Sequence, residues 1–67
     1  MKNVSKLMDT LRERFQIASD AALARELDIA PSVISKLRAG AKLGPTVILS
    51  IHEHLGVPVK EIRALAA

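Results

Sequence analysis

The chain has no cysteine, tryptophan or tyrosine, and Phe15 is its one aromatic residue. Without cysteine, neither a disulfide framework nor a thiolate metal site is available, which fits a reducing compartment. The scarcity of aromatic rings argues against binding of single-stranded nucleic acid, which relies on stacking bases against such rings. No apolar run approaches the length of a membrane span, and no segment resembles a signal peptide. These absences predict a cytoplasmic protein with no cofactor, no bound metal and no membrane partner.

Acidic residues are missing from one long stretch. Between Asp28 and Glu53 the chain has no aspartate or glutamate, whereas Lys36, Arg38 and Lys42 all lie within it. The overall net charge of +3 is modest, so its distribution is more informative than its size. A positive field concentrated on one segment favours a polyanionic partner.

The chain is short, with 67 residues, of which 49% are hydrophobic. This length suits one domain, residues 1–67, near the lower limit for an independent core. The apolar share is enough to build a core and too high for a disordered tail. A domain of this size has little interior for a water-excluding pocket, and its serines have no evident base partner in the sequence. We therefore predict that it is not an enzyme.

Residues 18–40 read as two short helices around a break. Ser19 is a good N-cap for a first helix, Asp20 to Leu27, because its hydroxyl can accept from a free backbone N–H. The break is 28–30. A second helix opens at Pro31, which is favoured at the first helical position, and closes near Arg38. Gly40 follows as the expected helix-ending residue.

The apolar residues of this segment fit two helices that pack on each other. Leu23, Ala24 and Leu27 share one face of the first helix, and Ile34 and Leu37 share one face of the second. Ala24 is small, so the two helices can cross closely over it. The outer side of the second helix then carries short or basic residues, without a carboxylate: Ser32, Val33, Ser35, Lys36 and Ala39. Such a helix is suited to a groove lined with phosphates.

These features resemble the helix-turn-helix of lambda-repressor and Cro-type DNA-binding proteins. The resemblance is carried by Ala24, the turn 28–29, the run 34–37 and Gly40. It covers roughly residues 4 to 65 in helix order and is specific over 18–42, with the helix-turn-helix itself at 19–39. The resemblance implies an all-α, lambda-repressor-like fold of five short helices, in which the second and third form the helix-turn-helix.

The resemblance also implies which residues meet DNA. The helix from Pro31 to Arg38 would be the recognition helix, whose first, second and sixth residues face base edges; these are Pro31, Ser32 and Lys36. Lys36 can donate to guanine O6 or N7, Ser32 can bond a base edge, and Val33 can pack against a thymine methyl. Phosphate contacts that fix the register are expected from basic and hydroxyl side chains: Ser19, Ser35, Arg38 and Lys42.

The sequence departs from the family pattern at three positions. Asp28 stands where the family usually has a glycine in the left-handed conformation, which aspartate tolerates better than most residues. Ala30 is a weak cap for the second helix. Asp20 stands where the family often has a glutamine near a phosphate, and a carboxylate there would repel the DNA backbone.

Helical spacing also marks the segments on either side. A first helix should run from Asn3 to Arg14 or Phe15, with Asn3 or Ser5 as its cap and an apolar stripe along one face: Val4, Leu7, Met8, Leu11 and Phe15. A fourth should run from Pro45 to about Leu55 and a fifth over 59–66. We expect the fourth to bury a wide apolar stripe: Val47, Ile48, Leu49, Ile51 and Leu55. The β-branched Val57 and Val59 leave a C-terminal β-hairpin, known in some Cro-type proteins, as an open alternative.

One recognition helix reads too few base pairs for useful specificity, so we expect a homodimer on a two-fold operator. The segment 45–66 is the candidate for the dimer contact, with Val59, Ile62 and Leu65 as its apolar face. The same three residues could instead cap the core.

The function expected from these features is sequence-specific binding to double-stranded DNA by a small Cro-type transcriptional repressor. No small-molecule ligand is expected, because there is no ligand domain. The alternative is a helical protein-interaction module or antitoxin-like partner; duplex binding with a steep salt dependence would separate the two. His52 and His54 do not suggest a metal site, because residues two apart on a helix point about 200° apart.

Overall fold

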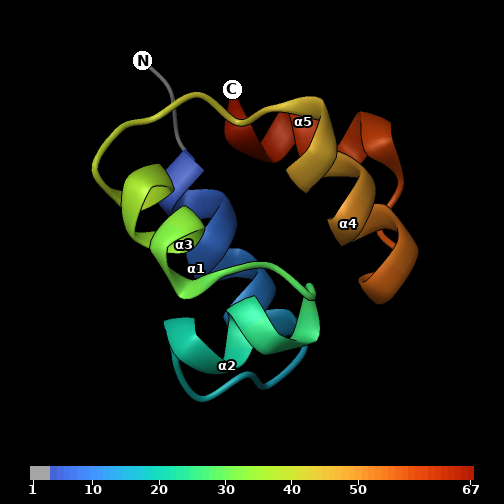
Figure 1. Ribbon diagram of the computed structural model, residues 1–67. Helices are drawn as coiled ribbons and strands as arrows, with labels where there is room; N and C mark the ends of the chain where they lie inside the picture. The colour runs from blue at the N-terminus through green and yellow to red at the C-terminus, as the bar shows by residue number, and fades with distance from the viewer. Residues whose placement is uncertain (1–3) are drawn as a thin grey trace.

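The structure, a computed structural model, describes residues 4–67, and within that range the chain forms five α-helices and no strand (Figure 1). The prediction of an all-α protein with five short helices is confirmed, and the C-terminal segment is a helix, not a hairpin. The predicted start and cap at Asn3 lie outside the described residues. No helix in residues 4–67 combines the length and the apolar character needed to cross a membrane. The helices are α1 (Val4–Arg14), α2 (Asp20–Glu26), α3 (Pro31–Arg38), α4 (Pro45–Leu55) and α5 (Val59–Ala66).

Helix α1 is the centre of the arrangement, because it contacts α2, α3 and α5 (Figure 1). Helix α3 also packs on α2, and α4 packs on α5. Ser5 lies inside α1, so it is not a cap. Phe15 lies just past the end of the helix and is 38% exposed. The prediction that Phe15 belongs to the buried stripe is therefore wrong.

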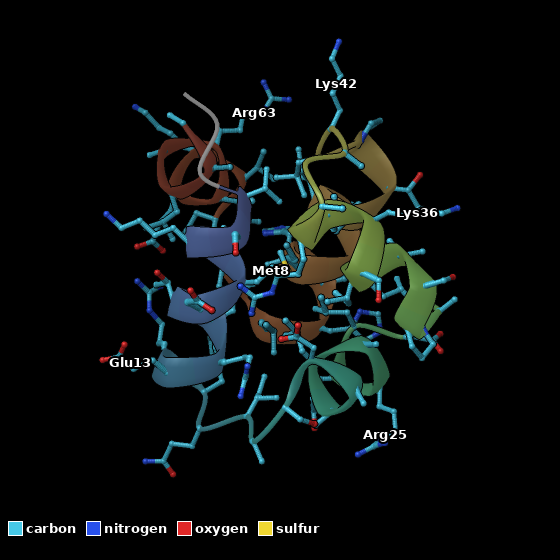
Figure 2. All side chains as sticks on the ribbon, turned by 90° about the vertical axis from the view of Figure 1, so that its left-hand side faces the viewer. Met8, Glu13, Arg25, Lys36, Lys42 and Arg63 are labelled. Carbon is cyan, nitrogen blue, oxygen red and sulfur yellow. The ribbon has the colours of Figure 1, made fainter. Side chains whose placement is uncertain are left out.

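The core contains no aromatic side chain. It is aliphatic except for Met8, which is fully buried near the middle of the molecule (Figure 2). An unbranched thioether fills irregular space well, which suits the place where several short helices meet. Every helix contributes to this one cluster: Val4, Leu7, Met8, Leu11, Leu23, Ala24, Leu27, Ile34, Leu37, Val47, Ile51, Val57 and Ile62.

Helices α1, α2 and α3 all end in the same kind of turn. In each, a residue with positive φ follows the helix: Gln16 at 53°, Asp28 at 55° and Gly40 at 107°. The next residue then donates its N–H to a carbonyl five residues back, as in a Schellman motif. The N···O distances are 2.8 Å for Ile17 to Arg12, 3.0 Å for Ile29 to Ala24 and 2.9 Å for Ala41 to Lys36. The left-handed conformation expected at Asp28 is confirmed, whereas the same conformation at Gln16 was not expected.

Helix α4 buries a narrower face than its sequence predicts. Val47 and Ile51 are buried and Ile48 and Leu55 pack against the core, but Leu49 is 52% exposed. The prediction that Leu49 widens the buried stripe is therefore wrong. The reason is that the main partner of α4 is α5, which covers only part of its circumference.

Candidate functional site

Helices α2 and α3 are joined by a short turn, residues 27–30. The Ser19 Oγ accepts from the N–H of Ala22 at 3.1 Å and so caps α2, which ends at Glu26 with Leu27 as its C-cap. Ala24 is fully buried and belongs to the core cluster. Ile29 in the turn is half-buried and packs against the core.

Helix α3 presents a continuous exposed stripe to solvent. Ile34 and Leu37 are buried on the opposite side, which fixes the face that points outward. The stripe carries no carboxylate and consists of Pro31, Ser32, Ser35, Lys36 and Ala39. We refer to these five residues as the α3 stripe. Val33 is half-buried against the core, so of the four residues predicted to face bases it is only partly available.

The charge around α3 differs between its two ends. Towards its C-terminal end, Lys36 and Lys42 extend into solvent (Figure 2). Near its N-terminal end, the exposed Arg25 of α2 points to the same side as Lys36 in Figure 2, but an exposed carboxylate, Asp28, lies only three residues before α3. The positive field is therefore strongest around Lys36 and the loop that follows. Arg25 was not singled out from the sequence; its place on the outer face of α2, opposite Leu23, is the signal that could have found it.

Arg38 bonds to groups from two other helices. Its Nε and Nη2 donate to the two carboxylate oxygens of Asp20 at 3.0 and 2.9 Å, a bidentate pair. Its Nη1 lies 2.8 Å from Asp9 Oδ1 and donates to the carbonyl oxygen and Oγ of Ser5 at 2.9 and 2.7 Å. Arg12 Nη1 donates to Asp20 Oδ1 at 3.2 Å. We call Ser5, Asp9, Arg12, Asp20 and Arg38 the Arg38 cluster.

The Arg38 cluster changes two expectations. All three nitrogens of the Arg38 guanidinium are already bonded, and its side chain is 22% exposed, so the predicted phosphate contact of Arg38 conflicts with this arrangement. The hydrogen bonds from Arg38 keep the pKa of the Asp20 carboxyl below its ordinary value despite some desolvation, so Asp20 stays ionised. Its charge is balanced, because the cluster contains two carboxylates and two guanidiniums. The expected repulsion of a DNA backbone by Asp20 is correspondingly reduced.

The remaining residues predicted to contact phosphate are accessible. Ser19, Ser35 and Lys42 are all exposed, and Ser35 lies on the α3 stripe. Ala30, as expected, provides no side-chain cap for α3. The phosphate contacts of Ser19, Ser35 and Lys42 stay predictions.

The predicted dimer face on α5 is mostly turned inward. Ile62 is fully buried in the core, so its assignment to a dimer contact is wrong: the apolar spacing reflects packing within the chain. Leu65 is half-buried and packs against the core, and Val59 is half-buried. Only the outer edges of Val59 and Leu65 are available to a partner.

The two histidines of α4 do not form a metal site. The Nδ1 atoms of His52 and His54 each lie 2.9 Å from a different carbonyl oxygen, those of Val57 and Ser50. Residues 4–67 contain no group of three or more potential metal-ligating side chains. A surface pocket lies between the loop after α3, α4 and α5, and its described lining has no serine, histidine or carboxylate side chain: Val4, Lys42, Leu43, Pro45, Ile48, Arg63, Ala66 and Ala67.

Comparison of this chain with models of known protein families, with curated proteins and with solved structures finds no match.

Proposed function

We propose that this protein binds double-stranded DNA sequence-specifically, with α2 and α3 acting as a helix-turn-helix. The observation that carries the proposal is the α3 stripe, five exposed residues without a carboxylate on a helix whose opposite face is anchored by Ile34 and Leu37. A helix presented in this way fits the major groove, where its outer face meets base edges. The basic loop that follows supports the same orientation, because Lys42 extends into solvent beside it (Figure 2).

Within this proposal, the side chains divide into those that read bases and those that hold phosphates. Lys36 donates to guanine O6 or N7, and Ser32 donates to or accepts from a base edge. Pro31 and the exposed part of Val33 contact the groove, with Val33 against a thymine methyl. Lys42, Ser35 and Ser19 hold phosphates and fix the register.

The biological role that fits is a small transcriptional repressor of Cro type that acts as a homodimer on a palindromic operator. A single recognition helix covers only a few base pairs, and two copies on a two-fold site give a useful ratio of specific to non-specific affinity. The second copy would pack against the outer edges of Val59 and Leu65, which are half-buried in the single chain.

The direct test is selection of duplexes from a random pool at moderate salt, followed by titration of the selected duplex over a range of salt concentrations. We expect enrichment of an inverted repeat and a steep fall in affinity with salt, because phosphate contacts release counterions. Absence of any complex with duplex DNA in dilute buffer would refute the proposal. It would leave the protein-interaction module as the better explanation of the fold.

A further inference from the structure

The Arg38 cluster joins the three helices around the candidate site. Arg38 is the last residue of α3, Asp20 is the first of α2, and Asp9 lies in the middle of α1. Apart from this cluster, α3 is anchored by two buried side chains, Ile34 and Leu37, and by the half-buried Val33. Helix α3 therefore has both an apolar anchor and a polar one.

The two anchors constrain α3 differently. Apolar contacts are non-directional, so a few of them on an eight-residue helix leave some freedom for the helix to roll about its axis. The bidentate pair between Arg38 and Asp20 has a planar, directional geometry, with donor–acceptor distances of 2.9 and 3.0 Å. Asp9 and Ser5 hold Nη1 from α1 at 2.7 to 2.9 Å. Together these bonds oppose a roll of α3 in either direction.

A small roll would matter at the α3 stripe. Recognition of a base edge requires side chains within about 10–20° of the productive geometry. Lys36 and Ser32 lie on the same rigid helix as Arg38, so a roll at one end moves them all. The orientation of α3 is thus set at a residue that the stripe does not include.

We propose that Arg38 is a positioning residue, which together with Asp20 and Asp9 fixes the roll of α3 and thereby sets the discrimination between DNA sequences. The proposal rests on the function proposed above. It replaces the simpler idea that Arg38 holds a phosphate. The two ideas predict opposite results when the partners of Arg38 are changed.

The experiment compares two substitutions with matched controls. Arg38→Lys keeps the charge but cannot form the bidentate pair; its control is Arg63→Lys on the exposed part of α5. Asp20→Asn breaks the bidentate pair with Arg38 but leaves the bonds of Arg38 to Ser5 and Asp9. Its control is Glu13→Gln, which makes the same charge change on an exposed residue of α1, on the opposite side of the view from Lys36 (Figure 2). For each variant we would measure affinity for the selected duplex and for a random duplex, at temperatures where circular dichroism shows a folded protein.

We expect Arg38→Lys and Asp20→Asn to lower the ratio of selected to random affinity by about tenfold, comparable to one mismatched base pair. Affinity for random duplex should match that of each control. A phosphate-binding Arg38 would behave differently. Arg38→Lys would then keep the ratio, and Asp20→Asn would tighten binding to both duplexes beyond the effect of Glu13→Gln. Either of those results would overturn the proposal.

A measurement on the protein alone separates this inference from the proposed function. Residual dipolar couplings of the α3 amides should change in Asp20→Asn and stay as in the unaltered protein in Glu13→Gln, while those of α4 change in neither. Unchanged α3 couplings would overturn the positioning role. If the unaltered protein shows no preference among DNA sequences, the proposed function itself is refuted. The link between the orientation of α3 and the discrimination between DNA sequences is then refuted with it.

Discussion

Helices α3 and α5 are both eight residues long and amphipathic, yet they are held to the rest of the molecule in different ways. Helix α5 buries Ile62 completely, packs Leu65 and Ala66 against the core, and has one exposed ion pair, Arg14 to Glu61, at 3.1 and 3.3 Å. Helix α3 buries Ile34 and Leu37 and ends in the Arg38 cluster.

The outward faces differ as well. Helix α5 exposes Lys60, Arg63 and Ala64, and it also carries a carboxylate, Glu61, which pairs with Arg14 of α1. Helix α3 exposes Lys36 with no carboxylate of its own. Two helices with similar amphipathic patterns are therefore held differently: α5 mainly closes the core through apolar contacts, whereas α3 combines apolar contacts with the Arg38 cluster and leaves an exposed face without carboxylates.

The largest effect is expected from replacing Ile62, which tests whether α5 is part of the core. Ile62→Ala should cost about 2–5 kcal/mol of unfolding free energy, because it leaves a cavity at a fully buried site. That is a large share of the total stability of a small domain. Urea denaturation measures it, with Arg63→Ala on the same helix as the control that should change stability by less than about 0.5 kcal/mol. A loss at Ile62 as small as at Arg63, together with a shift of sedimentation towards monomer, would restore the dimer assignment.

The second largest effect is expected when the exposed lysines of α3 and α5 are compared for their contribution to DNA binding. Lys36→Ala should cost about 1–3 kcal/mol of affinity for the selected duplex and relax the preference at one base pair. Lys60→Ala removes the same charge from α5 and should leave the preference intact. Equal losses in the two variants would mean that only net charge matters. Titrations with the selected duplex and its single-base variants provide the measurement.

The third effect concerns the loop after α3. Lys42→Ala should weaken binding to all duplexes about equally and reduce the slope of log affinity against log salt by roughly one, because one phosphate contact is lost. Lys60→Ala removes a cation of α5 that does not line the pocket shared by Lys42 and Arg63, and it should leave the slope unchanged. A loss confined to the selected duplex would place Lys42 at a base instead of a phosphate.

The smallest effect would compare the ion pairs of the two helices. The pKa of Asp20 is lowered, chiefly by its hydrogen bonds from Arg38, so its stabilisation is complete above its ordinary pKa and is lost as the pH falls through the lower folded value. Asp20→Asn should therefore cost about 1 kcal/mol at neutral pH, and this difference should shrink below about pH 4. Glu61→Gln breaks an exposed pair and should cost about 0.5 kcal/mol or less. Urea denaturation between neutral and acid pH checks both, and a cost at Asp20 that grows in acid would contradict the sign.

The helices were predictable from sequence because their signals are local. Pro31 and Pro45 begin helices, Gly40 and Gly56 follow them, and Ser19 caps α2 as expected. The Arg38 cluster was not predictable, because residues 9, 20 and 38 meet only once three helices have packed.

The extent to which each apolar face is buried could also not be predicted from the sequence. Leu49 and Ile62 both fit helical stripes, but the position of neighbouring helices leaves one half-exposed and buries the other. Periodicity identifies an apolar face without saying how much of it a neighbour covers. The same limit applies to basic residues: sequence alone did not separate Lys36, which is exposed, from Arg38, which is bonded within the molecule.

The absence of rings from the core also decides how this molecule can be observed. Tryptophan and tyrosine dominate the near-ultraviolet absorbance and fluorescence of proteins, and this chain has neither. The protein itself therefore absorbs and fluoresces very weakly in this range. Dye- or base-analogue fluorescence from a duplex could then be read without interference. A single tryptophan in place of Phe15, which lines a surface pocket together with Leu55, would add one reporter of changes between the turn after α1 and the end of α4.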